Sequence, residues 1–289
     1  MKLSNSRIEF RFYFDRRIMS SIVVIFGDTQ IGSSTALAPP KFTIHNNDEK
    51  EVQVVNHNRL QEWLWESWVD AWDYVKTLAG VRGKHRKHRI IAIHMGDVID
   101  GNHHGTNQII QDVADQYIVA LDILHPIFDM ADVAFGILGT EVHAGKSCGD
   151  EVAIYKELSA REYSHTLSLS IDGKLHDFAH HGRVGGRPWT SQAASIATEV
   201  CLDYADQGLP IPNYIWRAHN HIVDDSGFKL PNARAITIPS WQLKTTFGNR
   251  VAANRVRSDI GLFIVNNGMI DETKSRYKGQ PDGRKVIEV

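Results

Sequence analysis

The chain has 289 residues and a formal net charge of −2, with 42% hydrophobic and 23% charged residues. These values are close to globular averages, so the chain can bury a sizeable core, and they exclude a general electrostatic attraction to nucleic acid or to an anionic membrane. Two cysteines, Cys148 and Cys201, exclude a disulfide framework and favour a reducing, cytoplasmic compartment, and no apolar run approaches the roughly 20 residues of a membrane span.

The segment before the first strong strand, residues 1–18, is an N-terminal extension without the pattern of a secretory signal. Two interpretations of it stay open. Apolar Ile8, Phe10 and Phe12 alternate with other residues as in an edge strand, whereas Met19, next to the first buried run, suits a later start of translation.

Hydrophobic periodicity and turn residues predict the secondary structure. The predicted elements are a strand at 22–26, a helix at 58–79, a strand at 89–95, a helix at 107–124, a strand at 133–138, a helix at 151–163, a hairpin of 165–171 with 175–180, a helix at 190–205 capped by Thr190 or Ser191, and strands at 213–218, 233–238 and 260–265. Because strand–helix alternation gives way to strands, we expect an α/β (α+β) fold layered about one core. A single domain should cover residues 19–270, followed by a polar tail over 271–289.

Residues of the metal-ligand type follow five of the predicted strands. They are Asp28 and Gln30; Asp97 and Asp100; Thr140, Glu141 and His143; His180 and His181; and His219 and His221. In open α/β sheets, sites form outside the carboxyl ends of the strands, so side chains far apart in sequence can converge there. Mixed Asp and His donors suit Mn, Fe, Ni, Co or Zn better than Mg or Ca. Asp97, in a tight Gly-Asp turn, is the natural carboxylate to bridge two cations.

The order of these motifs resembles the calcineurin-like metallophosphoesterase superfamily, over residues 22 to about 222. The matching segments are Gly27-Asp28-Thr29-Gln30, Gly96-Asp97-Val98-Ile99-Asp100, Gly139-Thr140-Glu141-Val142-His143, His181-Gly182 and Ala218-His219-Asn220-His221. The extensions Gly32-Ser33-Ser34 and Gly101-Asn102-His103-His104-Gly105 look like phage and prophage members of that family. The resemblance implies a four-layer α/β/β/α sandwich with mixed central sheets.

The resemblance also implies the roles of the site residues. One metal would be held by Asp28, Gln30, Asp97 and His221, and the other by Asp97, Thr140, His181 and His219. Asp100 would brace the site from behind the ligands. A metal-bridging hydroxide would attack phosphorus while two divalent cations, for which we favour Mn over Fe, Ni or Zn, neutralise the phosphoryl oxygens. His143 would bind the phosphate or protonate the leaving oxygen.

The chain departs from the family pattern at two positions. Gln30 replaces a histidine, so the first metal is either labile or supported by His103 or His104. Thr140 replaces an asparagine, and Glu141 is an alternative ligand there. His180 competes with His181, because neighbours on one strand face opposite sides; we favour His181, since Gly182 follows it.

The predicted function is hydrolysis of phosphomonoesters or phosphodiesters. The alternative is a catalytically decayed accessory protein that binds metal or nucleic acid, which Gln30 and Thr140 motivate. A metallo-β-lactamase-like or amidohydrolase-like enzyme is disfavoured, because those enzymes carry a His-x-His motif early in the chain. The expected partner is a phosphate ester. Nucleic acid is a weaker candidate, because the basic run 82–89 has no interleaved aromatic residue for base stacking.

Overall fold

The computed structural model describes residues 20–45, 52–81, 86–103, 107–182, 192–227, 230, 232–245 and 257–281. The N-terminal extension, the two candidate cap residues of the helix at 190–205, and His104 lie outside these ranges. Within these ranges, no helix is both long enough and apolar enough to span a bilayer.

The first sheet has six strands in the order β13-β12-β1-β4-β5-β6. The strands are β1 (Ser21–Phe26), β4 (Arg89–His94), β5 (Val133–Ile137), β6 (Glu162–Ser164), β12 (Phe263–Asn266) and β13 (Met269–Asp271). Strands β1, β4, β5 and β6 are parallel, whereas β12 and β13 are antiparallel to their neighbours. Strands β1 and β4 are mostly apolar and buried, as expected for a sheet that is covered on both faces.

The second sheet has five strands in the order β10-β11-β9-β8-β7. They are β7 (Thr166–Ile171), β8 (Lys174–Ala179), β9 (Tyr214–Arg217), β10 (Asp224–Asp225) and β11 (Arg234–Thr237). Strands β7 and β8 form the predicted hairpin, and β8, β9 and β11 run parallel. A separate two-stranded ribbon joins β2 (Lys41–Ile44) to β3 (Gln53–Asn56).

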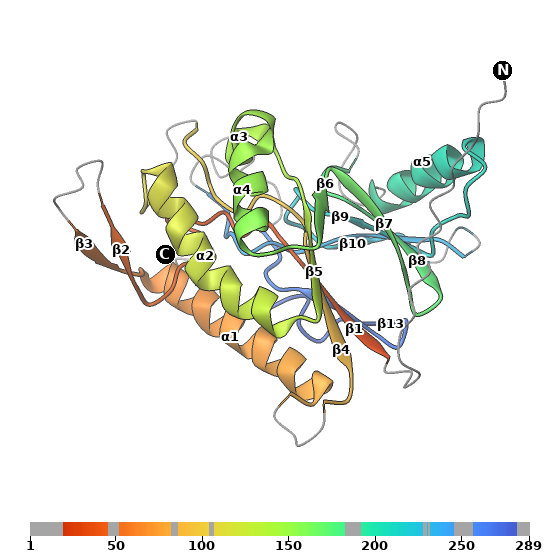
Figure 1. The fold of residues 1–289 in the computed structure, drawn as a ribbon, viewed down its shortest axis with the longest axis horizontal. Helices are drawn as coiled ribbons and strands as arrows, with labels where there is room; N and C mark the ends of the chain where they lie inside the picture. Colours follow the sequence, from red (N-terminus) through yellow and green to blue (C-terminus); the bar gives the residue numbers. More distant parts are fainter. Residues whose placement is uncertain are drawn as a thin grey trace, which may run out of the picture.

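Helices cover the outer faces of the two sheets (Figure 1). They are α1 (Arg59–Ala79), α2 (Val113–Met130), α3 (Glu141–Ala144), α4 (Gly149–Glu157) and α5 (Gln192–Asp206). Helices α1 and α2 pack on the first sheet, and α5 packs on the second. The layers therefore follow the order helix, sheet, sheet, helix, which confirms the predicted four-layer α/β/β/α sandwich with mixed sheets.

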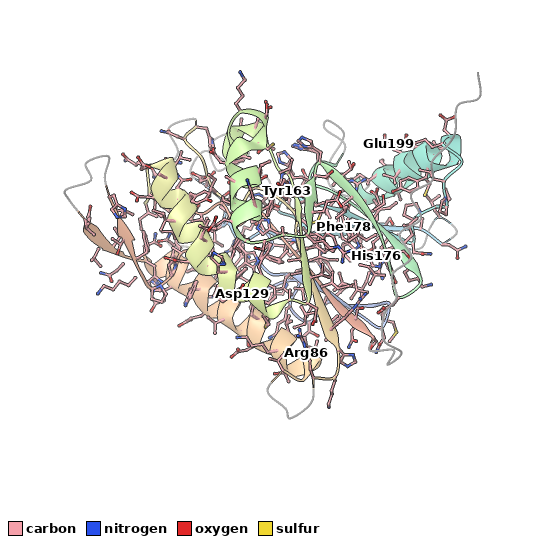
Figure 2. All side chains as sticks on the ribbon, in the orientation of Figure 1. Arg86, Asp129, Tyr163, His176, Phe178 and Glu199 are labelled. Atoms are coloured by element: carbon pink, nitrogen blue, oxygen red, sulfur yellow. The ribbon has the colours of Figure 1, made fainter. Side chains whose placement is uncertain are left out.

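The core between the two sheets contains apolar side chains from both (Figure 2). It also contains His176 of β8, which is 1% exposed and stacks near Phe178 and Trp216. Trp216 Nε1 donates a hydrogen bond to His176 Nδ1 at 3.2 Å, so this imidazole is held as an acceptor inside the core.

Helix α1 begins and ends where its sequence signals predict. The Asn58 side chain accepts from the backbone N–H groups of Leu60 and Gln61, and Gln61 returns a bond to Asn58 N, which completes a capping box. Gly80 ends the helix with a φ of 71°, a left-handed conformation that favours glycine. Trp68 and Trp72 are buried against Phe26 of β1.

Two helix boundaries differ from the prediction. The helix predicted at 107–124 begins only at Val113, because the Asp112 side chain caps it, and it continues through Pro126 to Met130. The helix predicted at 151–163 ends at Glu157, because residues 162–164 join the first sheet as β6. Strands β2, β3, β10 and β13 were not predicted either; each has four residues or fewer.

Candidate metal centre

The candidate site lies where loops leave the carboxyl ends of β1, β4, β5, β8 and β9. Backbone hydrogen bonds join the first two loops: Asp28 N donates to Gly96 O at 2.9 Å, and Gln30 N donates to Asp97 O at 3.0 Å. The third loop joins them at Asp97, which accepts from Thr140 N at 2.7 Å. The predicted convergence at one edge therefore occurs.

Five of the predicted ligand residues have left-handed backbones. The φ angles are 48° for Asp28, 46° for Gln30, 52° for Asp97, 68° for His219 and 56° for His221. Such a conformation costs a non-glycine residue on the order of 1–3 kcal/mol and persists only where the surrounding structure imposes it. Its concentration in these loops indicates that the backbone is shaped to aim these side chains.

Glycines provide the close approach that the loops need. A Cβ on Gly139 would lie 2.1 Å from Asp97 Oδ1, and a Cβ on Gly96 would lie 2.8 Å from Gly139 Cα and from His180 Nδ1. Gly96 also has a φ of 95°. Larger residues at these two positions would push the loops apart.

Asp97 is buried at the centre of the site and is contacted from three loops. Its Oδ1 accepts from Thr140 Oγ1 at 2.9 Å, and its Oδ2 accepts from Gln30 Nε2 at 3.4 Å. His143 Nε2 lies 3.9 Å from Oδ2 on another side. The carboxylate is thus fixed in orientation between residues that were predicted to serve two different metals.

Asp28 is fully buried beside the late histidine pair. Its Oδ2 accepts from His219 N at 3.1 Å, and its Oδ1 lies 3.4 Å from His221 Nε2. Asp28 Oδ1 and Gln30 Oε1 are buried and have no hydrogen-bond partner among the described residues. Buried oxygens of this kind are costly unless a cation or another donor meets them.

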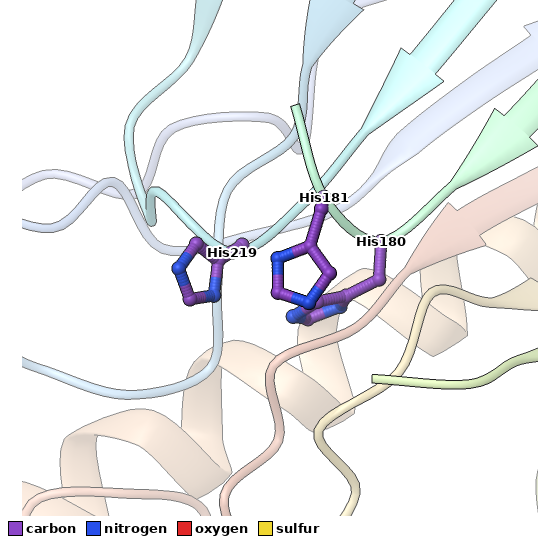
Figure 3. A group of neighbouring side chains, drawn as sticks. All are labelled: His180, His181 and His219. Atoms are coloured by element: carbon purple, nitrogen blue, oxygen red, sulfur yellow. The ribbon is translucent and has the colours of Figure 1, made fainter. Parts of the chain in front are cut away.

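Three imidazoles converge next to these carboxylates (Figure 3). One ring nitrogen from each of His180, His181 and His219 lies within 4.8 Å of the others, and His180 forms a second such group with Asp28 and Asp97. His180 is buried, with Nε2 3.1 Å from Asp97 Oδ2.

Both neighbouring histidines, His180 and His181, reach the site, which the strand rule did not predict. That rule places adjacent side chains on opposite faces. However, β8 ends at Ala179, so neither residue lies in the strand and the rule does not apply. The expectation that one of the two histidines points away from the site is therefore wrong, whereas the preference for His181, which rests on Gly182 after it, stays a prediction.

A third group lies beside the centre and contains Asp100, His103 and His143. His143 Nδ1 donates to Asp100 O at 2.8 Å, which leaves Nε2 as the nitrogen that faces Asp97. The buried Asp100 carboxylate accepts from Gln108 Nε2 at 2.8 Å and from Gln242 Nε2 at 3.4 Å. Asp100 thus positions His143 and is itself held in place.

Burial and charge set the protonation states of the centre. Burial raises the pKa of Asp97, but the charges of His180 and His143 outweigh burial and hold the pKa low. Burial lowers the pKa of His180, but the charges of Asp97 and Asp28 raise it to about 10. Burial, followed by the charge of His180, lowers the pKa of His219 to about 4 and also lowers that of His181. Neutral imidazoles at pH 7 carry the lone pair that binds a metal.

The donor set fits divalent transition metals. Carboxylates from Asp28 and Asp97, an unpaired amide oxygen from Gln30, and imidazoles from the later loops are the ligand types of Mn, Fe, Co, Ni and Zn sites. Potential ligands lie on both sides of Asp97. The individual ligand assignments, including the hydroxyl of Thr140, stay predictions.

The chain matches no protein-family model, and no curated protein is similar to it in sequence. Solved structures with a similar arrangement include an archaeal phosphodiesterase (11% identity, TM-score 0.42, 86% of this chain and 97% of the other). A hypothetical protein from Pyrococcus horikoshii (8%, 0.46, 87% and 86%) and Vps29 from Entamoeba histolytica (12%, 0.37, 86% and 96%) are also similar. Because all three TM-scores are below 0.5, these similarities carry no information about the chemistry of this chain.

Glu141 does not join the centre. It is exposed, and its Oε1 accepts from Ser147 N at 3.0 Å in the same short loop. A different carboxylate, Glu151 of α4, contacts two loops of the centre. It is fully buried and accepts from Val98 N at 2.9 Å and from Gly139 N at 2.6 Å. No sequence signal distinguished Glu151 from an ordinary helix residue.

Proposed function

We propose that the chain is a metal-dependent phosphoesterase of the calcineurin-like type, with two divalent cations held on either side of Asp97. The observation that carries the proposal is the buried Asp97 carboxylate, which lies between the Asp28–Gln30 loop and the loops of Thr140 and His180. A buried carboxylate between two donor sets is the arrangement of a dinuclear hydrolytic site.

The two sets would divide the ions as follows. Asp28, Gln30, Asp97 and His221 would hold one ion, and Asp97, Thr140, His181 and His219 would hold the other. When bound, the cations would neutralise phosphoryl oxygens and supply a nucleophile from water near neutral pH. The remaining steps depend on the residues of the chain.

His143 is placed to move a proton in the reaction. Its Nδ1 is committed to Asp100 O, so the tautomer is set and Nε2 faces the centre beside Asp97. From this position, Nε2 of the doubly protonated, cationic ring would contact the phosphate or protonate the leaving oxygen, and the ring would then be left as the neutral Nδ1–H tautomer. Its side chain is 16% exposed, which supports access from solvent.

A phosphate ester fits the site better than a long nucleic acid. The described part of the basic run, residues 86–89, leads into β4 at the end of that strand opposite Asp97. Within its described part, Arg86 pairs with Asp132 at 2.9 Å and Arg89 donates to Ser21 Oγ at 2.7 Å. These contacts turn cationic groups toward the protein. A phage origin and the preference for manganese stay predictions.

The test is turnover of p-nitrophenyl phosphate and of its bis-ester with added Mn²⁺. We expect at least one to be hydrolysed by the wild type, and the ratio of the two rates assigns monoester or diester preference. Asp97→Asn should lower kcat on the order of 100-fold or more while the circular dichroism spectrum stays unchanged, because the bridging charge is lost.

Asp206→Asn, an exposed change on α5, is the matched control and should retain wild-type turnover. Wild-type inactivity toward both esters with every divalent metal tried would leave the accessory-protein alternative. An active Asp97→Asn variant would remove the bridging role of Asp97.

A further inference from the structure

We propose that His180 is a direct ligand, through Nε2, of the cation that Asp28 and Asp97 hold, and that it supplies the imidazole that Gln30 does not. The inference rests on the proposed function, since it assigns a further donor to the same centre. It concerns the histidine that the sequence analysis set aside in favour of its neighbour His181.

The orientation of the His180 ring supports this role. Its Nδ1 lies 2.6 Å from Met95 O, a carbonyl that can only accept, so Nδ1 carries the proton in this bond. The other nitrogen, Nε2, then points at the two carboxylates, 3.1 Å from Asp97 Oδ2 and 3.9 Å from Asp28 Oδ1. A ring that donates one N–H to a backbone carbonyl and aims the other nitrogen at a shared point is the usual geometry of a metal-binding histidine.

Burial distinguishes His180 from the other histidines of the centre. His180 is 1% exposed, and its Nε2 is buried with no hydrogen-bond partner among the described residues. Asp28, Asp97 and His180 form the one fully buried group of potential ligands in the described part of the chain. The polar neighbours of this nitrogen are the two carboxylates, so a cation between the three groups would be coordinated by all of them.

The backbone holds His180 where the ring cannot turn away. Ala218 N donates to His180 O at 2.9 Å, which ties the loop after β8 to the loop after β9. Gly96 leaves the space for the ring, since a Cβ there would lie 2.8 Å from His180 Nδ1. The ring therefore lies between the loops that follow β4 and β9.

The donor chemistry explains why such a residue is useful here. Gln30 offers a neutral amide oxygen, a weaker donor for Mn, Fe, Co, Ni or Zn than an imidazole. The Gln30 side chain contacts Asp97 through its Nε2, and His180 Nε2 faces the same carboxylate as well as that of Asp28. With His180 included, the first ion has an imidazole from a buried residue in addition to that of His221.

The test compares metal affinity in the wild type and in His180→Gln, by calorimetric titration of the metal-free proteins with Mn²⁺ and Zn²⁺. We expect one of the binding steps in the titration, that of the ion held by Asp28 and Asp97, to be at least about 100-fold weaker in the variant, since a direct ligand is lost. His176→Gln is the matched control: it removes another buried imidazole from the same strand region, outside the centre, and should leave the affinity unchanged.

A purely electrostatic role for His180 predicts a different change in metal affinity. If the ring were only a charged partner of the carboxylates, its removal would leave Asp28 and Asp97 without that partner, and metal binding would stay equal or become tighter. That result would overturn the inference and leave the proposed function intact. A wild-type protein that binds no divalent metal would instead contradict the proposed function itself.

A measurement on the wild type decides the case in which His180→Gln does not fold. The protein is labelled with ¹⁵N-histidine and loaded with ¹¹³Cd²⁺, and scalar coupling between the metal and each ring nitrogen is recorded by NMR. Coupling to Nε2 of His180 is the expected result. Metal coupling to other histidines of the centre without coupling to His180 would overturn the inference.

Discussion

At the residue scale, the geometry of the centre depends on close contacts around the Asp97 carboxylate. Thr140 fixes one carboxylate oxygen through its backbone N–H and its hydroxyl, and Gln30 approaches the other. Gly139 makes this packing possible, because its missing side chain is where Oδ1 of Asp97 lies. Site geometry held this tightly is a form of preorganisation, so small displacements should matter for binding.

Gly139→Ala should therefore weaken metal binding more than it weakens the fold. The new Cβ would lie 2.1 Å from Asp97 Oδ1, so Asp97 must move away from its position. We expect the affinity for Mn²⁺, measured by calorimetry, to fall on the order of 10-fold or more. Gly149→Ala is the control, because it has a helical φ of −60° and no atom within 4 Å of its Cβ position. Equal affinity in both variants would contradict the packing argument.

Some residues of the site were predictable from the sequence, and others were not. The predicted ligands Asp28, Asp97 and His221 converge because each follows a parallel strand, a rule that needs no coordinates. Strand alternation predicted that only one of His180 and His181 reaches the site, and this rule fails because both residues lie beyond the end of β8. Glu151 contacts only backbone N–H groups, which no side-chain motif reveals.

At the element scale, helix α4 acts as a brace between two loops of the centre. It extends from Gly149 to Glu157, and its one fully buried carboxylate, Glu151, accepts from the backbone of both the Val98 and the Gly139 loops. Burial, followed by the charge of Asp97, raises the pKa of Glu151 to about 7. The helix thus connects the second and third loops without contributing a ligand.

Glu151→Ala should destabilise the metal-free protein by about 1–3 kcal/mol, measured by urea unfolding at pH 6, below the raised pKa of the glutamate, where the substitution relieves no buried charge. Alanine has no accepting oxygen, so both buried N–H groups would lose their partner. Glu157→Ala, an exposed change on the same helix, should have little effect. Equal stability of the two variants would show that Glu151 does not brace the loops.

Element boundaries were predicted well where local signals are strong. The capping box at Asn58 and the turn at 172–173 act through neighbouring residues, so the sequence alone indicates α1 and the β7–β8 hairpin. Strand β6 was missed because its three residues form a strand only through pairing with β5, a tertiary contact. Helix α2 was started too early because the loop before it is apolar enough to continue the periodicity.

At the scale of the whole molecule, the two sheets enclose an apolar core, and one histidine is buried in it. His176 is 1% exposed, and burial lowers its pKa to about 4. Trp216 donates to its Nδ1, which requires the neutral ring. The layered architecture was predictable from the order of strands and helices, whereas a neutral histidine between the sheets was not, because β8 was predicted without its burial pattern.

The stability of the fold should therefore fall as the pH is lowered from about 6.5 to about 4. Over this range the unfolded chain protonates His176 and the folded protein does not, so the unfolded state gains protons and is favoured. Neutral His176 contributes about 3 kcal/mol to the free energy of unfolding above pH 6.5, and this contribution is lost as the pH falls to about 4. Urea unfolding of wild type and His176→Gln across this range measures it. Parallel pH profiles for the two proteins would contradict the neutral buried ring.

The central claim is that the loops around Asp97 hold two divalent cations, and metal content combined with anomalous scattering tests it most directly. The protein is reconstituted with Mn²⁺, freed of excess metal, analysed for metal per chain, and crystallised for data at the manganese edge. The account predicts two ions per chain, with both anomalous peaks in contact with Asp97 and the imidazoles of the late loops close by. Fewer than one tightly bound ion per chain, or peaks away from Asp97, would contradict it.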